Sequence, residues 1–172
     1  MAGDDFLSVT VVGERSLSRN FDTLPDIAQE IILAKVEGYT KDLEDAVIQS
    51  IEQKTTTKTG RLIQAVRREV VRRGGGIEGR VYIDENVAPY AKPIDQGASI
   101  PPHMIYPKNG KVLAFIAATG DKVFATRVFH PGAQITPRYF MKDARREKGP
   151  AISRGLKNAL VQGIRAHMRS KS

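Results

Sequence analysis

The sequence contains no cysteine and no tryptophan, and aromatic residues make up only 6% of it. Without cysteine there is no disulfide, thiolate nucleophile or sulfur-ligated metal, a composition that suits assembly in a reducing cytoplasm. No stretch approaches the roughly 20 apolar residues of a membrane span, and the acidic N-terminus does not fit a secretory signal. We therefore expect a soluble, unprocessed chain. With no aromatic residue after Phe140, stacking platforms for single-stranded nucleic acid are also disfavoured.

Signatures of cofactor and metal chemistry are missing as well. The three histidines are far apart and lack the spacing of a metal site, and no phosphate-binding or serine-nucleophile motif is present. Gly74, Gly76 and Gly79 match the GxGxxG pattern, but strand-like sequence follows them where a dinucleotide site needs a helix. The glycines are better explained as a hairpin turn, and we predict no cofactor and no metal.

A catalytic role would need acidic or histidine side chains that meet in space. Asp84, Glu85, Asp95 and His130 are the candidates for shared general acid and base roles. Acidic residues of this kind are more often surface or turn residues. We predict that the protein is not an enzyme, with a hydrolase or nuclease as the less favoured class.

The net charge of +8 is unevenly distributed along the chain. Residues 1–54 contain 11 acidic and 5 basic side chains, a net charge of −6, whereas residues 55–172 contain 8 acidic and 22 basic ones, a net charge of +14. Such a division predicts different partners for the two halves, because opposite charges steer association. The basic half fits nucleic acid, an acidic neighbouring protein or a solvated surface.

The clearest secondary-structure signal is a long helix opened by Pro25, about 28 residues in length. Its apolar residues recur at steps of three and four: Ile32, Val36, Tyr39, Leu43, Val47 and Ile51. Before it, residues 6–12 predict a short strand or an extended arm, so we divide the chain into an arm over residues 1–21 and a single domain over residues 22–172.

Two hairpins and a second helical segment are expected after the long helix. Residues 61–73 and 77–84 flank the triple glycine, and residues 111–118 and 122–129 flank a second turn, which gives four antiparallel strands. The prolines of residues 86–108 predict a loop with one helical turn near residues 90–96. A helix from Pro137 to about Lys148, interrupted at residues 149–150, then continues with apolar residues spaced by four.

This C-terminal helical region is rich in basic side chains that neutralise phosphates without reading bases. The candidates for facing DNA are Arg145, Arg146, Lys148, Arg154, Lys157, Arg165 and Arg169. Contact with DNA, docking on a protein and a plain solvated surface all fit this pattern.

Five short segments, in a fixed order over roughly residues 22–170, resemble a family of minor virion proteins of long-tailed bacteriophages. These are called neck, head-tail joining or tail-completion proteins. After the long first helix, the matching residues are Thr59, Gly60, Arg61 and Leu62; Tyr90, Ala91, Asp95 and Gly97; Lys111, Leu113 and Phe115; His130, Pro131 and Gly132; and Pro137, Arg138, Phe140, Met141 and Ala144. The chain departs from the family at residues 94–97, where the family tends to read hydrophobic-Glu-hydrophobic-Gly, and in its proline-rich loop.

The resemblance implies a structural subunit of a ring, six-fold or twelve-fold, around the DNA passage between head and tail. It implies assembly in the bacterial cytoplasm, a place in the virion neck or tail, and contacts with connector, head-closure and tail tube or terminator proteins. Nonspecific contact with packaged double-stranded DNA is possible, and no membrane is involved. The residues that we assign to subunit interfaces are Tyr90, Asp95, Gly97, His130, Pro131, Gly132, Arg138 and Phe140.

The expected fold is therefore α+β, with a four-stranded antiparallel sheet packed on the long N-terminal helix and a C-terminal helix that packs on the sheet or on a neighbour. The alternative to the architectural function is a free-standing, nonspecific DNA-binding protein.

Overall fold

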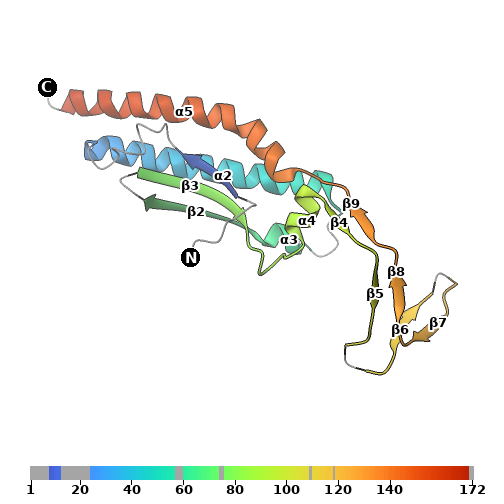
Figure 1. Ribbon diagram of the computed structural model, residues 1–172. Coiled ribbons are helices and arrows are strands. Elements are labelled where there is room, and N and C mark those ends of the chain that lie inside the picture. The colour runs from blue at the N-terminus through green and yellow to red at the C-terminus, as the bar shows by residue number, and fades with distance from the viewer. Residues whose placement is uncertain are drawn as a thin grey trace.

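The molecule has two parts, a body of helices and sheet and a narrow two-stranded ribbon that projects from one end of it (Figure 1). The computed structural model describes residues 8–12, 24–56, 60–73, 76–108, 110–117 and 119–170. We call residues 98–135 the ribbon and the rest of the described chain the body. The fold mixes helices with antiparallel strands, which confirms the α+β prediction.

Helix α2 (Asp26–Lys54) is the central element of the body, and its start confirms the role predicted for Pro25. The carbonyl of Pro25 accepts the backbone N–H groups of Ala28 and Gln29 at 2.8 and 3.0 Å, which closes the first turn. Residues at the predicted apolar positions are buried, with Tyr39 partly so: Ile32, Val36, Leu43, Val47 and Ile51. Because α2 contacts both α5 and the sheet, its buried side supplies much of the core.

The sheet of the body has three strands in the order β1-β3-β2, all antiparallel. Strands β2 (Val66–Arg73) and β3 (Gly76–Ile83) form the first predicted hairpin, and β1 (Ser8–Val12) pairs with the other edge of β3. A short helix, α3 (Arg61–Gln64), precedes β2 where we predicted strand. Gly79 lies where β3 crosses α2, since a Cβ there would be 2.0 Å from the Thr40 hydroxyl oxygen. This glycine therefore serves close packing, and the turn residues 74–75 lie outside the described residues.

Helix α5 (Phe140–Ser170) runs antiparallel to α2 and packs along it (Figure 1). The predicted interruption at residues 149–150 is wrong, because Pro150 lies inside one continuous helix. A proline removes one backbone hydrogen bond and bends a helix, and the buried residues on both sides of it keep α5 against the core. These residues are Phe140, Met141, Ala144, Ile152, Leu156 and Ala159.

The predicted four-stranded sheet is corrected by the pairing of residues 98–135. The second predicted hairpin exists as β6 (Leu113–Ile116) and β7 (Lys122–Ala125), but it pairs with no strand of the first sheet. Four more strands flank this hairpin in the sequence. Two lie in the region predicted to be loop, and two follow from residue 128 onward. They are β4 (Ala98–Ile100), β5 (His103–Ile105), β8 (Val128–His130) and β9 (Ala133–Ile135). The helical turn predicted near residues 90–96 is present as α4 (Ala91–Gln96).

Candidate interaction site

The ribbon is built from three successive antiparallel pairs that share no strand with the body. From base to tip, β4 pairs with β9, β5 with β8, and β6 with β7. Each pair stands alone as a two-stranded sheet. A two-stranded hairpin is marginal at best in water, because it lacks a third strand or a helix packed over its side chains. The ribbon therefore has few stabilising contacts of its own among the described residues.

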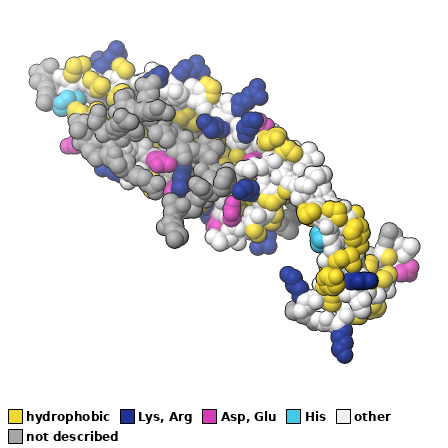
Figure 2. Space-filling view, viewed as in Figure 1, with side chains coloured by type: hydrophobic (Ala, Val, Ile, Leu, Met, Phe, Trp, Pro, Cys, Tyr) yellow, Lys and Arg dark blue, Asp and Glu magenta, His cyan; other side chains and the backbone are white. Residues whose placement is uncertain are grey.

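Large apolar side chains on the ribbon face solvent, and Figure 2 shows them as a yellow band along the projecting part. Ile116 is 75% exposed, and Phe124, Phe129 and Tyr106 are each about 60% exposed. The full set on the ribbon is Ile100, Met104, Ile105, Tyr106, Val112, Phe115, Ile116, Phe124 and Phe129. Large contiguous apolar surfaces on soluble proteins mark interaction sites. Covering these side chains would provide the free energy that a two-stranded ribbon lacks by itself.

The ribbon changes pairing between β4–β9 and β5–β8, where two histidines and a glycine form a compact joint. His103 and His130 are register partners, and their rings stack with centroids 5.0 Å apart. The Gly132 backbone N–H donates to His130 Nδ1 at 3.0 Å, so the proton of a neutral His130 ring is on Nε2. Gly132 has φ of 87°, and a Cβ there would be 2.5 Å from the Ile100 carbonyl oxygen. The His-Pro-Gly motif thus forms the joint of the ribbon.

The base of the ribbon is fixed to the body through main-chain contacts. Gly97 leaves α4 with φ of 79°, a left-handed conformation that favours glycine. On the returning side, the Arg138 N–H donates to the carbonyls of Ile94 and Asp95 at 3.0 and 3.1 Å, and the Tyr139 N–H donates to Asp95 at 2.9 Å. Both ends of the ribbon are therefore held beside α4.

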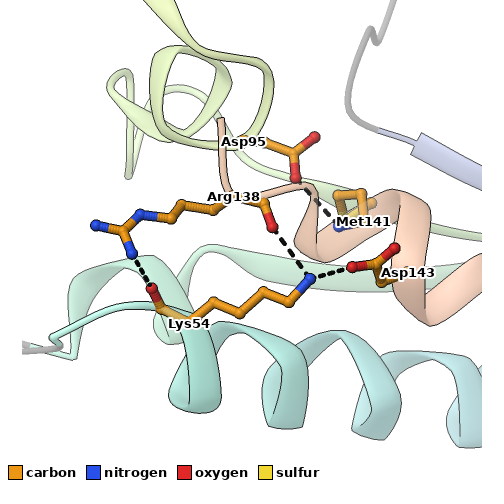
Figure 3. Close-up of polar contacts among 5 residues, drawn as sticks. All are labelled: Lys54, Asp95, Arg138, Met141 and Asp143. Carbon is orange, nitrogen blue, oxygen red and sulfur yellow. Dashed lines mark hydrogen bonds and ion pairs between the residues drawn. The ribbon is translucent and has the colours of Figure 1, made fainter. Parts of the chain in front are cut away.

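Asp95 joins α4 to the start of α5. Its carboxylate Oδ1 accepts the Met141 backbone N–H at 3.2 Å, so a side chain from another element caps the N-terminus of α5 (Figure 3). Asp95 is only 4% exposed, and burial raises its pKa above the ordinary 3.8, against the opposing hydrogen bonds from Met141 and Phe140. A buried carboxylate at a helix N-terminus is a structural cap, and this one lies beside the root of the ribbon.

Lys54, the last residue of α2, completes the base. Its ammonium donates to the Arg138 carbonyl at 3.1 Å and pairs with the Asp143 carboxylate, while the Arg138 guanidinium donates to the Lys54 carbonyl at 3.0 Å (Figure 3). The hydrogen bond from Lys54 lowers the pKa of Asp143 below its ordinary value. We call Lys54, Asp95, Arg138 and Asp143 the base cluster. It ties α2, α4 and α5 together where the ribbon leaves the body.

The interface candidates predicted from sequence lie at the base of the ribbon, at its joint and beside α4. Asp95, Gly97 and Arg138 meet at the base, and Phe140 follows them as a fully buried core residue at the start of α5. The motif at residues 130–132 lies further along the ribbon, at the joint. Tyr90 is 38% exposed beside α4. The sequence motifs thus mark the positions that shape and anchor the ribbon.

The basic candidates on α5 face solvent in most cases. Arg145, Arg146, Arg154, Lys157, Arg165 and Arg169 are exposed. Lys148 is half-buried and pairs with Glu147 at 2.8 Å, which raises the pKa of Lys148. Figure 2 shows several of the dark blue side chains along the edge of the body. This surface is electropositive and separate from the ribbon.

The acidic and histidine candidates for catalysis are engaged in separate places. Asp84 accepts the Asn86 N–H at 3.0 Å in the turn after β3, Asp95 caps α5, and His130 stacks on His103 in the ribbon. Within the described part of the chain, no group of three or more histidine, aspartate or glutamate residues could hold a metal ion. In that same part, no helix combines the length and hydropathy needed to cross a bilayer.

Sequence reasoning missed the apolar tip of the ribbon and half of the base cluster. The excess of Val, Phe and Ala in residues 111–129 predicted strands, but nothing in it distinguished buried strands from exposed ones. Lys54 and Asp143 are 89 residues apart, and no local pattern signals such a pair. No family model, curated protein or solved structure matches this chain, so its resemblance to phage neck proteins remains a prediction.

Proposed function

We propose that this protein is a structural subunit of a ring in the neck of a long-tailed bacteriophage, where it helps join the DNA-filled head to the tail. The observation that carries the proposal is the ribbon, which exposes nine large apolar side chains on a two-stranded segment to which no third strand or helix of the described residues is packed. A body with such an arm contacts neighbours through two separate surfaces, as a ring subunit does. Its work is then geometric, without bond making or breaking.

The positions of the motifs support this function. Three of the five segments that resemble the neck family, at residues 90–97, 130–132 and 137–144, fall at the base and joint of the ribbon, where they fix the direction of the arm. Their conformations depend on glycines with positive φ at residues 97 and 132. A virion protein that works by fitting between neighbours needs an arm with a defined direction, and these residues provide it.

Electron microscopy tests the proposal most directly. Purified protein, alone and mixed with connector and tail components of its phage, should form rings or join the neck assembly. Phage carrying a stop codon in this gene should accumulate filled heads and tails that are not joined. A chain that stays monomeric with every neck component, or a mature particle whose neck lacks it, would end the proposal.

The second candidate is a nonspecific DNA-binding protein, favoured by the exposed arginines of α5. Binding through phosphates falls steeply with salt. Reversal of Arg154 and Arg165 to glutamate should then remove duplex binding at low salt while ring formation stays intact. Undetectable binding of the unaltered protein at low salt would remove this candidate and leave the ring proposal standing.

A further inference from the structure

The tip of the ribbon presents one apolar face with a basic residue on it. In the β6–β7 register, Ala114 is opposite Phe124 and Ile116 is opposite Lys122, and alternation along each strand puts these four side chains on the same side. We call them the tip face. Ile116 and Phe124 are its most exposed members, at 75% and 60%. The Lys122 ammonium lies 5.6 Å from the Phe124 ring centre, so charge and apolar surface are adjacent.

The charge of the ribbon restricts what can cover the tip face. The ribbon contains four basic residues and one acidic residue, a net charge of +3. A second ribbon would repel it, and so would α5, which contains eight basic and two acidic residues. The surface that fits the tip face must combine apolar contact with negative charge.

The outward side of α2 has both properties. The helix contains seven acidic and three basic residues, a net charge of −4. Ile27, Ile31 and Ala34 follow one another at helical spacing, and Ile27 is 40% exposed, Ala34 is exposed and Ile31 is half-buried. Glu30 and Glu37 are exposed beside this line. We call these five residues the α2 face.

We infer that the tip face of one copy docks on the α2 face of the next copy. This rests on the proposed ring and specifies the contact that closes it. The ribbon leaves the body beside the C-terminal end of α2, whereas the α2 face lies toward its N-terminal end (Figure 1). A helix of 29 residues is about 43 Å long, so a copy cannot cover its own α2 face without losing the base contacts. Donor and acceptor surfaces at opposite ends make a head-to-tail contact, which repeats around a ring.

Disulfide trapping tests the contact, because the chain has no cysteine of its own. A double variant, Ile116→Cys with Ala34→Cys, should give a ladder of linked species on mild oxidation, with a last band at the ring order. Each single variant can give dimers at most. The matched control replaces Ala34→Cys by Asn158→Cys, which is exposed on α5, and should give no ladder. Equal ladders from both double variants, or none from the Ile116–Ala34 pair in assembled rings, would overturn the inference.

Charge reversal gives an independent test that needs no new covalent bond. Lys111→Glu with Lys122→Glu should weaken self-association about tenfold or more at low salt, and Glu30→Lys with Glu37→Lys should do the same. Combining all four changes in one chain should restore assembly. The matched controls have equal charge change elsewhere: Lys142→Glu with Arg145→Glu, and Glu85→Lys with Glu147→Lys. Loss without restoration in the fourfold variant, measured by sedimentation velocity, would contradict the contact.

The two proposals fail in distinguishable ways. Rings that form normally in both twofold charge-reversal variants, Lys111→Glu with Lys122→Glu and Glu30→Lys with Glu37→Lys, would refute the docking contact and leave the neck function intact. A particle neck without this chain would refute the function, whatever the trapping experiment gives in solution. Ladders that require the connector or tail proteins would support both.

Discussion

The body and the ribbon distribute apolar residues in opposite ways. In the body, Phe140 is fully buried together with the apolar side of α2, whereas in the ribbon Phe124 and Ile116 face solvent. Both regions contain strands with Val and Ile, so the difference comes from layers: the body sheet is covered by α2, and no other element of the described residues packs over the ribbon. The body thus has a buried core of its own, whereas the ribbon exposes an apolar surface of the kind that marks interaction sites.

The largest difference in stability should come from replacing a phenylalanine by alanine in each region. Phe140→Ala should cost about 3–5 kcal/mol of unfolding free energy, because it empties a closed core. Phe124→Ala should change stability by less than about 0.5 kcal/mol and weaken self-association instead. Urea unfolding followed by circular dichroism, with sedimentation velocity, measures both. Similar stability costs would show that the ribbon has a core of its own.

Two glycines of the ribbon with nearly equal φ angles provide the next test. Gly132 and Gly120 have φ of 87° and 89°, but a Cβ on Gly132 meets backbone within 3.1 Å whereas Gly120 faces open space. Gly120→Ala should cost about 1–2 kcal/mol locally and Gly132→Ala clearly more. Amide hydrogen exchange of the ribbon would report this, while body amides stay protected. Equal exchange in the two variants would contradict a fixed joint at the histidines.

At the junction of the two regions, Asp95→Ala should cost about 1–2 kcal/mol, since the cap of α5 is lost. Asp95→Asn retains an acceptor and should cost less. Because the pKa of Asp95 is raised in the folded state, its linked stability is present below pH 3.8 and lost as pH rises through the raised pKa. The stability of the wild type relative to the Asp95→Asn variant should therefore increase as the pH falls toward 3.8. Thermal melts over a pH series would measure this, and an opposite slope would contradict it.

The smallest effect belongs to the half-buried ion pair of the base cluster, Lys54 with Asp143. Asp143→Asn should lower the melting temperature slightly at neutral pH and low salt, and less at high salt. The folded pKa of Asp143 is lowered, so its contribution is present above pH 3.8 and lost as pH falls through that lower value. Melting curves of wild type and variant should thus converge in acid. Melting curves that stay apart at pH values below the lowered pKa of Asp143 would show that its carboxylate has a role beyond the ion pair with Lys54.

Local patterns predicted the body well. The spacing from Ile32 to Ile51 gave α2, the turn of residues 74–76 gave β2 and β3, and the apolar steps after Pro150 gave the second half of α5. Each of these signals lies within a few residues of the element that it predicts. The helix interruption at Pro150 was wrong because packing against α2 outweighs the lost hydrogen bond.

The ribbon and its base were harder to predict, for a physical reason. Ser99 and Gln134 are 35 residues apart and Asp95 and Met141 are 46 apart, yet each pair is in contact. The prolines at residues 101 and 102 favoured a loop, but both lie between β4 and β5, outside the paired positions, so they cost no ladder bond. The motifs at residues 95–97 and 130–132 identified the right places without the geometry that connects them.

The fixed base also makes the ribbon a lever. Residues 98–116, nineteen in all, lead from the first residue of β4 to the tip at Ile116, at most about 60 Å of extended chain. A rotation of about 5° at the base would move such a tip by roughly 5 Å, while the stacked His103 and His130 rings at the joint link the two strands. Small rotations where α2, α4 and α5 meet are thereby converted into larger displacements of the ribbon tip. In the proposed ring, an arm of this kind could follow a neighbour whose diameter or symmetry differs from that of the ring.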